Sequence, residues 1–139
     1  MPDEVILTPH LREMSRLTGL PIDEIQGDPL GISRFYSNKW NKIVVLKGAH
    51  TIIAASNGDA FINEAANPAL ASAGTGDVLA GIIGGLIAQR VPLLSAAILG
   101  VYIHSRSASN VSKTVGVSGL LASDLLPEIP VVMEKLRRY

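Results

Sequence analysis

The sequence predicts an α/β fold, in which strands and helices alternate around a sheet. Three observations predict it. Two apolar runs, residues 4–8 and 43–47, are separated by segments with helical spacing. Two further short apolar runs, 51–55 and 60–63, flank a turn sequence and predict a hairpin. A glycine-containing stretch, residues 67–77, leads directly into a strongly apolar segment with helical spacing.

Composition is typical of one globular domain, and we expect residues 1–139 to form one. Apolar residues make up 47% and charged residues 17%, which favours a packed core. The formal net charge is zero, so we expect neither nucleic acid nor a membrane surface as a partner. The chain has no cysteine, which excludes disulfides and thiolate metal sites and favours a cytoplasmic location.

The first strand and helix follow from residues 4–19. The run 4–8 is stopped by Pro9 and predicts a buried strand. Residues 10–19 predict a helix that ends at Gly19. Its apolar residues recur at a spacing of three: Leu11, Met14 and Leu17.

A second helix is expected from Asp28 to about Asn41. Residues 21–25 before it suit a loop or a short helical turn. Asp28 is a suitable N-cap and Pro29 a suitable first helical residue. The helix is expected to bury four large side chains: Ile32, Phe35, Tyr36 and Trp40.

The run 43–47 is β-branched and apolar almost to its end, as in a strand covered on both faces of a parallel sheet. The hairpin that follows turns at Asn57-Gly58, where we expect both residues to supply positive φ angles.

Two buried helices are expected next, at residues 77–90 and 93–111. Gly81, Gly84 and Gly85 lie inside the first, and each costs about 1 kcal/mol in helix propensity relative to alanine. We expect close packing around these glycines to offset that cost. In the second helix one side is small or buried: Ala96, Ala97, Gly100, Val101 and His104.

Residues 112–119 are expected to form a loop, followed by short helices at 120–126 and 128–138 that break at Pro127 and Pro130. The predicted sheet is thin for such apolar helices. Either further strands come from an N-terminal part that precedes these residues, or another subunit covers the exposed core.

The stretch from Gly74 to Asp77 contains the residues that we expect to bind phosphate and to accept a proton. Glycines at 74 and 76 allow a ligand to approach the backbone closely. The first amides of the following helix attract phosphate, and Asp77 is placed to accept a proton. An isolated aspartate at a helix start is more often an N-cap.

At this point the sequence resembles the C-terminal part of the ADP-dependent NAD(P)H-hydrate dehydratases, which have a ribokinase-like fold. Four segments carry the resemblance in the family's order: Leu7-Thr8-Pro9-His10 with Glu13-Met14; Val45 to Thr51; Asn67 to Gly81; and Ala122 to Leu125 with Ile129-Pro130. The resemblance implies a three-layer α/β/α sandwich, of which this chain covers only the C-terminal half of the domain.

The resemblance also implies the reaction. Family members phosphorylate the hydroxyl of hydrated NADH or NADPH with ADP and then eliminate phosphate. Asp77 would be the base, and the amides of Gly74, Thr75, Gly76 and Asp77 would form the anion hole. Mg²⁺ would come with the ADP or ATP, because the sequence shows no ligand cluster for a metal. The resemblance further suggests a homo-oligomer.

The resemblance assigns binding roles to the remaining candidates. His10 would contact the hydrated nicotinamide nucleotide; from the residues alone, a solvent-facing position in the first helical turn suits it equally well. The adenine nucleotide would contact Lys47, Gly48, Ala49, His50 and Thr51. Asn67 would bind phosphate or stabilise the turn before Pro68. We expect His104 to be a packed or capping histidine and Asp124 to be a cap.

Two other functions remain open. The same base and anion hole suit a small-molecule kinase that acts on a sugar or hydroxymethylpyrimidine-like alcohol, although Thr8-Pro9-His10 argues against it. The chain could also be a fragment that binds adenine nucleotide without catalysis.

Overall fold

The computed structural model describes residues 4–64, 68–71 and 74–138. Strands and helices alternate through the first half, and helices fill the second. In chain order the elements are β1 (Ile6–Leu7), α1 (Leu11–Thr18), α2 (Ile22–Gly27), α3 (Pro29–Trp40), β2 (Ile43–Leu46), β3 (Ile52–Ala54), β4 (Ala60–Ile62), the 3₁₀ helix η1 (Pro68–Ala71), α4 (Thr75–Ala88), α5 (Leu93–Val115), the 3₁₀ helix η2 (Ala122–Leu125) and α6 (Glu128–Arg137).

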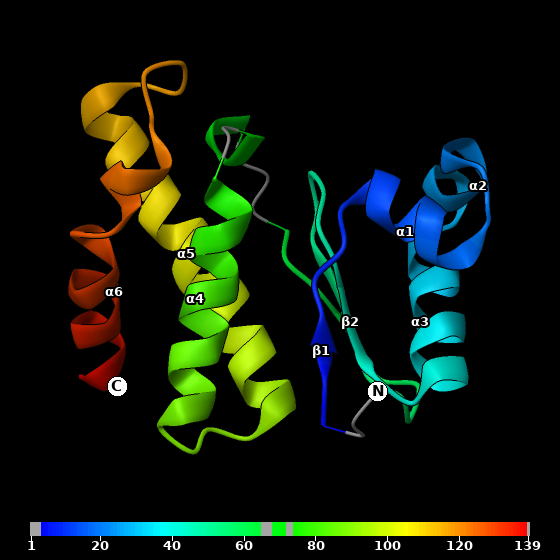
Figure 1. Cartoon of the computed structure of the whole chain (residues 1–139). Helices are drawn as coiled ribbons and strands as arrows, with labels where there is room; N and C mark the ends of the chain where they lie inside the picture. Colours follow the sequence, from blue (N-terminus) through cyan, green and yellow to red (C-terminus); the bar gives the residue numbers. More distant parts are fainter. Residues whose placement is uncertain (1–3, 65–67, 72–73, 139) are drawn as a thin grey trace.

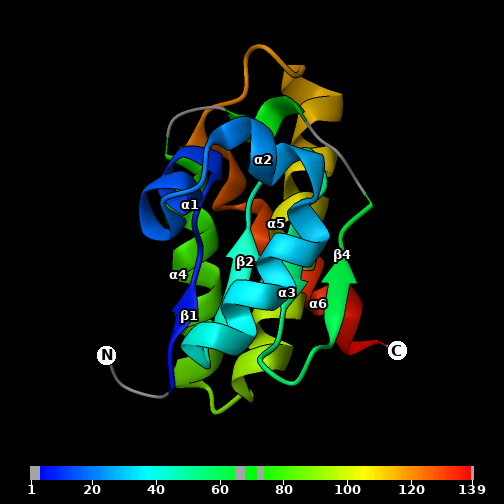
Figure 2. The same cartoon turned by 90° about the vertical axis from the view of Figure 1, so that its right-hand side faces the viewer.

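The molecule has three layers. In Figure 1, helices α1, α2 and α3 cover one face of the sheet, and α4, α5 and α6 lie on the other. Figure 2 shows β1 and β4 at opposite edges of the sheet, with α3 in front of it. This arrangement confirms the three-layer α/β/α architecture that the resemblance implied.

The described residues form a four-stranded mixed sheet in the order β1-β2-β3-β4. Strands β1 and β2 are parallel, and the pairs β2/β3 and β3/β4 are antiparallel. Strand β2 is buried on both faces, as its composition predicted. Val45 packs in the core with α4 and α5, whereas Val44 and Leu46 pack in the core that includes Met14 of α1.

The hairpin between β3 and β4 forms where it was predicted, but its turn differs from the prediction. Gly58 has a φ of 98°, whereas Asn57 does not adopt a positive φ. The Gly58 amide donates to Ala55 O, and the Ala55 amide donates to Asp59 O. A turn followed by one left-handed glycine closes this longer loop, so a single positive φ is sufficient. The Asn57 side chain instead accepts a hydrogen bond from the Asp59 amide.

Helix α3 begins as predicted, since the Asp28 side chain accepts from the Gly31 amide and Pro29 is the first helical residue. Its buried face was predicted wrongly in one respect. Phe35 is 61% exposed, and the fully buried residues are Ser33 and Ser37. Small side chains allow α3 to lie close to β2 and β3. The Ser37 hydroxyl lies 2.5 Å from Lys42 O and 2.9 Å from Ala54 O of β3.

Helices α4 and α5 form the second core, with Leu79, Ile82, Ile83 and Leu86 buried on α4. The predicted close packing around Gly81, Gly84 and Gly85 is wrong: a Cβ built on any of them meets no atom of the described residues within 4 Å. The close approach is made by Gly100 of α5 instead, where a Cβ would lie 2.5 Å from Ile83 Cγ1. A spacing pattern identifies the buried face of a helix, but it does not identify the point where two helices cross.

Two boundaries near the C-terminus also differ from the predictions. Helix α5 continues to Val115, so the loop predicted from residue 112 begins at Gly116, the C-cap. Pro130 does not break the last helix, because it lies in the first turn of α6. Proline is tolerated there, since the first amides of a helix have no intrahelical acceptor.

Candidate functional site

The candidate site lies where the carboxyl ends of β1 and β2 face the start of α4. The Lys47 amide, just after β2, donates to Pro9 O, just after β1, over 2.9 Å. A Cβ on Gly76 would lie 2.9 Å from Lys47 Nζ, so the ammonium group reaches the first turn of α4. Figure 1 shows that the chain leaves β1 toward α1 at the same end of the molecule where α4 starts. Ligands bind at such carboxyl ends in open α/β sheets.

Gly74 is the N-cap of α4 and has a φ of 84°. A Cβ at this position would lie 3.2 Å from Ala122 Cβ, so both the backbone angle and the space favour glycine. The Val78 amide donates to Gly74 O and closes the first helical turn. The amides of Gly76 and Asp77 come before Val78 in the chain, so they have no carbonyl acceptor within the helix. Free amides at a helix start attract anions.

Asp77 is the third residue of α4, and its side chain is exposed. The alternative that it is the N-cap is wrong, because Gly74 occupies that position without a side-chain hydrogen bond. The structure therefore places an accessible carboxylate on the same helical turn as the amides. A group in this place can accept a proton from a ligand held by those amides.

The predicted nucleotide contacts lie between β2 and β3. Lys47 is half-buried, and residues 48–50 are exposed in the loop that follows. Thr51 is half-buried, and its carbonyl accepts from the Asn63 amide. This loop follows directly from the Lys47 backbone that is bonded to Pro9, so it belongs to the same edge of the sheet. Asn67 lies outside the described residues.

His10 caps helix α1 through a reciprocal arrangement with Glu13. The imidazole Nδ1 accepts from the Glu13 amide at 3.2 Å, and Nε2 lies 2.9 Å from Glu13 Oε1. The Glu13 carboxylate also accepts from the His10 amide. The side chain is 50% exposed. His10 therefore has the local role expected of a residue at the start of a helix. It also follows Pro9 in the sequence, and the Pro9 carbonyl accepts a hydrogen bond from the Lys47 amide.

His104 is a packed histidine, as expected, but sequence reasoning did not predict that it bonds to the start of α4 beside the candidate site. It is only 7% exposed, and its Nε2 lies 2.8 Å from Thr75 O in the first turn of α4. Burial lowers the pKa of His104, the hydrogen bond to Thr75 opposes that shift, and the positive charge of Lys47 adds to it. The sequence feature that could have indicated this contact is a single histidine among the small, buried residues on one side of the second predicted helix.

Asp124 is a cap, as expected, and its side chain accepts a hydrogen bond from the Leu121 amide.

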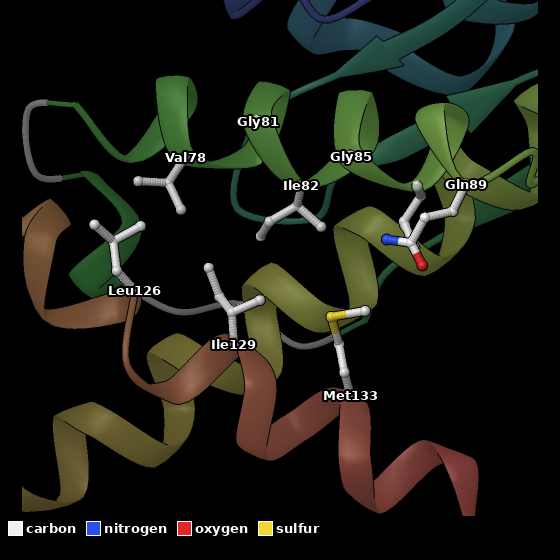
Figure 3. Close-up of a pocket in the computed structure, with 9 residues that line it drawn as sticks. Val78, Gly81, Ile82, Gly85, Gln89, Leu126, Ile129 and Met133 are labelled. Atoms are coloured by element: carbon white, nitrogen blue, oxygen red, sulfur yellow. The ribbon is translucent and has the colours of Figure 1, made fainter.

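A separate apolar groove of about 310 Å³ lies between α4 and the C-terminal elements (Figure 3). Its lining residues are Val78, Gly81, Ile82, Gly85, Leu86, Gln89, Leu126, Ile129 and Met133. None of the predicted site residues that the structure describes lines it. The groove runs along the side of α4, whereas the candidate site lies at its start.

Neither a metal-ligand cluster nor a membrane-spanning helix occurs in the described part of the chain. Across residues 4–64, 68–71 and 74–138, no three histidine, aspartate or glutamate side chains gather as metal ligands would. In the same ranges, every helix is too short or too polar to span a bilayer.

Comparison with known proteins finds relatives over most of the chain. A family model described as NAD(P)H-hydrate dehydratase matches residues 2–131. The chain is 42% identical over 132 residues to a bifunctional NAD(P)H-hydrate repair enzyme from Moorella thermoacetica, covering 95% of this chain and 25% of that protein. It is 40% identical over 124 residues to an ADP-dependent (S)-NAD(P)H-hydrate dehydratase from Neisseria meningitidis, covering 88% of this chain and 42% of that one.

Solved structures match over the same region. An ADP/ATP-dependent NAD(P)H-hydrate dehydratase from Bacillus subtilis, co-crystallised with ATP and Mg²⁺ and soaked with CoA, superposes with a TM-score of 0.90 at 35% identity. The match covers 95% of this chain and 49% of that structure. A ribokinase-like superfamily protein from Enterococcus faecalis gives a TM-score of 0.84 at 35% identity, over 96% of this chain and 45% of that one. The chain thus spans between a quarter and a half of the relatives' length, and it belongs to the NAD(P)H-hydrate dehydratase family.

Proposed function

We propose that this chain provides the phosphate-handling part of an ADP-dependent dehydratase that repairs hydrated NADH or NADPH. The observation that carries the proposal is the exposed Asp77 carboxylate on the first turn of α4, the turn that also contains the Gly76 amide and that the Lys47 ammonium reaches. A base, hydrogen-bond donors and a positive charge at one place are what phosphoryl transfer to a hydroxyl requires.

The reaction divides between these groups. Asp77 accepts the proton of the substrate hydroxyl while the hydroxyl oxygen attacks the terminal phosphorus of ADP, and AMP leaves. The first amides of α4 and the Lys47 ammonium stabilise the negative charge on the transferred group. Breaking the C–O bond then releases phosphate with the bonding electron pair, and loss of a proton from the neighbouring ring carbon forms the C=C bond of NADH or NADPH. Mg²⁺, carried by the nucleotide's phosphates, would screen their charge.

The remaining candidates have binding roles in this proposal. Residues 47–51 and Asn67 contact the AMP portion of the nucleotide, and His10 contacts the hydrated nicotinamide nucleotide. The Lys47–Pro9 hydrogen bond supports this division, because it keeps the two loops side by side at the sheet edge. We also propose that the chain acts as a homo-oligomer. The apolar groove between α4 and α6, which the exposed Leu126 helps to line, supports contact with another chain.

The test uses the purified 139-residue chain with hydrated NADH, ADP and Mg²⁺, and measures both ADP binding and NADH recovery. Asp77→Asn keeps the shape of the side chain but cannot accept the proton, so we expect NADH recovery to be lost while ADP still binds. Asp23→Asn is the matched control, because Asp23 is also an exposed aspartate in the first turn of a helix.

Three outcomes have distinct meanings. Undiminished recovery by Asp77→Asn would refute the role of Asp77. ADP binding without recovery by the unsubstituted chain would show a nucleotide-binding part that does not catalyse by itself. Failure to bind ADP, with a folded chain, would refute the proposed function as a whole.

A further inference from the structure

We infer that His104 is a positioning residue that aims the Gly76 amide at the phosphate site by holding the Thr75 carbonyl. The inference rests on the proposed function, since it assigns the histidine to the same site. His104 lies on α5, 29 residues from Thr75 in the sequence, and its ring reaches across to the start of α4.

The direction of the hydrogen bond is fixed by chemistry. The Thr75 carbonyl oxygen can only accept, so the Nε2 atom that lies 2.8 Å from it carries the hydrogen and donates. At 7% exposure the ring has little access to water, and this bond satisfies the donor inside the protein.

The bonded carbonyl and the Gly76 N–H belong to one planar peptide group. In a trans peptide these two bonds point in opposite directions, so holding the oxygen fixes the direction of the N–H. The N–H of that peptide is the one directed out of the start of α4, toward the site. Donation to the carbonyl also polarises the peptide and strengthens its N–H as a donor.

Thr75 is held at a second atom. Its hydroxyl donates to Leu70 O of η1 at 2.6 Å. The start of α4 is therefore tied to the preceding 3₁₀ helix by the Thr75 side chain and to α5 by the Thr75 backbone. The second tie passes through His104.

The experiment compares His104→Leu with His104→Gln. Leucine fills a similar space without a donor, whereas the glutamine side-chain amide can donate to the same carbonyl. We expect His104→Leu to weaken binding of ADP with Mg²⁺ by about tenfold, the scale for loss of one hydrogen bond from the misaimed Gly76 N–H to a phosphate group, and His104→Gln to stay within about threefold of the unsubstituted chain. Val101→Ala is the control for a general loss of packing, because Val101 is buried on α5 in the core and is not in the site.

A second readout does not need ADP. The amide resonance of Gly76, measured by NMR on the ligand-free chain, should differ between His104→Leu and His104→Gln. Because both variants lack the imidazole ring, the difference does not come from the loss of the ring itself. Equal ADP affinity and equal Gly76 resonances in the two variants would overturn the inference. A Val101→Ala variant that loses ADP affinity as strongly as His104→Leu would also overturn it. If the unsubstituted chain fails to bind ADP, the proposed function fails, and the Gly76 resonance alone decides whether His104 orients this peptide.

Discussion

The close approach of α5 to α4 at Gly100 allows a stability prediction with a sign and a magnitude. A Cβ on Gly100 would lie 2.5 Å from Ile83 Cγ1, whereas carbon atoms in contact are about 3.5–4.0 Å apart. Ile83 is 3% exposed and is surrounded by core residues, so its side chain has little room to turn away. In Gly100→Ala the two helices must separate by about 1 Å at their crossing point, and overpacking of this kind costs about 1–3 kcal/mol.

Gly84→Ala is the matched control, because Gly84 is also helical but a Cβ there meets no atom of the described residues within 4 Å. Both substitutions gain about 1 kcal/mol of helix propensity, so that term cancels between them. The free energy of unfolding should therefore be about 1–3 kcal/mol lower for Gly100→Ala than for Gly84→Ala.

Urea unfolding measures this difference, with the transition midpoint compared at equal m-values. We expect Gly84→Ala to raise the midpoint above that of the unsubstituted chain. His104 lies four residues beyond Gly100 on the same helix, so separation of the helices should also weaken its bond to Thr75. Equal stabilisation by both substitutions would refute the packing that we describe between α4 and α5.

Two further predictions concern buried polar groups. Ser33 and Ser37 are both fully buried on α3, but within the described chain the Ser33 hydroxyl has no hydrogen-bond partner, whereas that of Ser37 bonds backbone carbonyls. Thermal unfolding should show that Ser33→Ala stabilises and Ser37→Ala destabilises the fold, each by about 1 kcal/mol, and a shift of the same sign for both would contradict this. Because the pKa of His104 is lowered in the folded chain, the unfolded chain binds a proton more readily, and stability should fall as the pH drops through the ordinary histidine pKa of about 6.5. Urea midpoints measured on both sides of that pH should decline less on acidification in His104→Leu, and an equal decline would exclude His104 as the cause.

Local sequence patterns predicted most of the elements, because each depends on neighbouring residues. Asp28 and Pro29 start α3 by filling the cap and first-turn positions themselves. Gly74 adopts a positive φ that other residues rarely adopt, and α4 follows from it. The apolar run of β2 predicted burial on both faces, which the two separate cores around Val44 and Val45 confirm.

Predictions failed where the answer depends on a partner far away in the sequence. Phe35 was expected in the core, but the small Ser33 and Ser37 side chains face the sheet instead. At these positions the helix lies so close to the sheet that only small side chains fit between them. The α4 glycines were expected to be packed, yet Gly100 on the neighbouring helix makes the close contact. Hydrophobicity and spacing describe one helix at a time, so they contain no information about which residue faces the crossing point.

The candidate site shows the same division. The sequence by itself determined the stretch from Gly74 to Asp77 and the chemistry of its groups, because helix starts, glycine angles and carboxylates act locally. Only the tertiary structure decided that the Lys47 ammonium lies against Gly76 and that His104 holds the Thr75 carbonyl. Both contacts join segments that are 29 residues apart, and the packing of the sheet and helices brings them together.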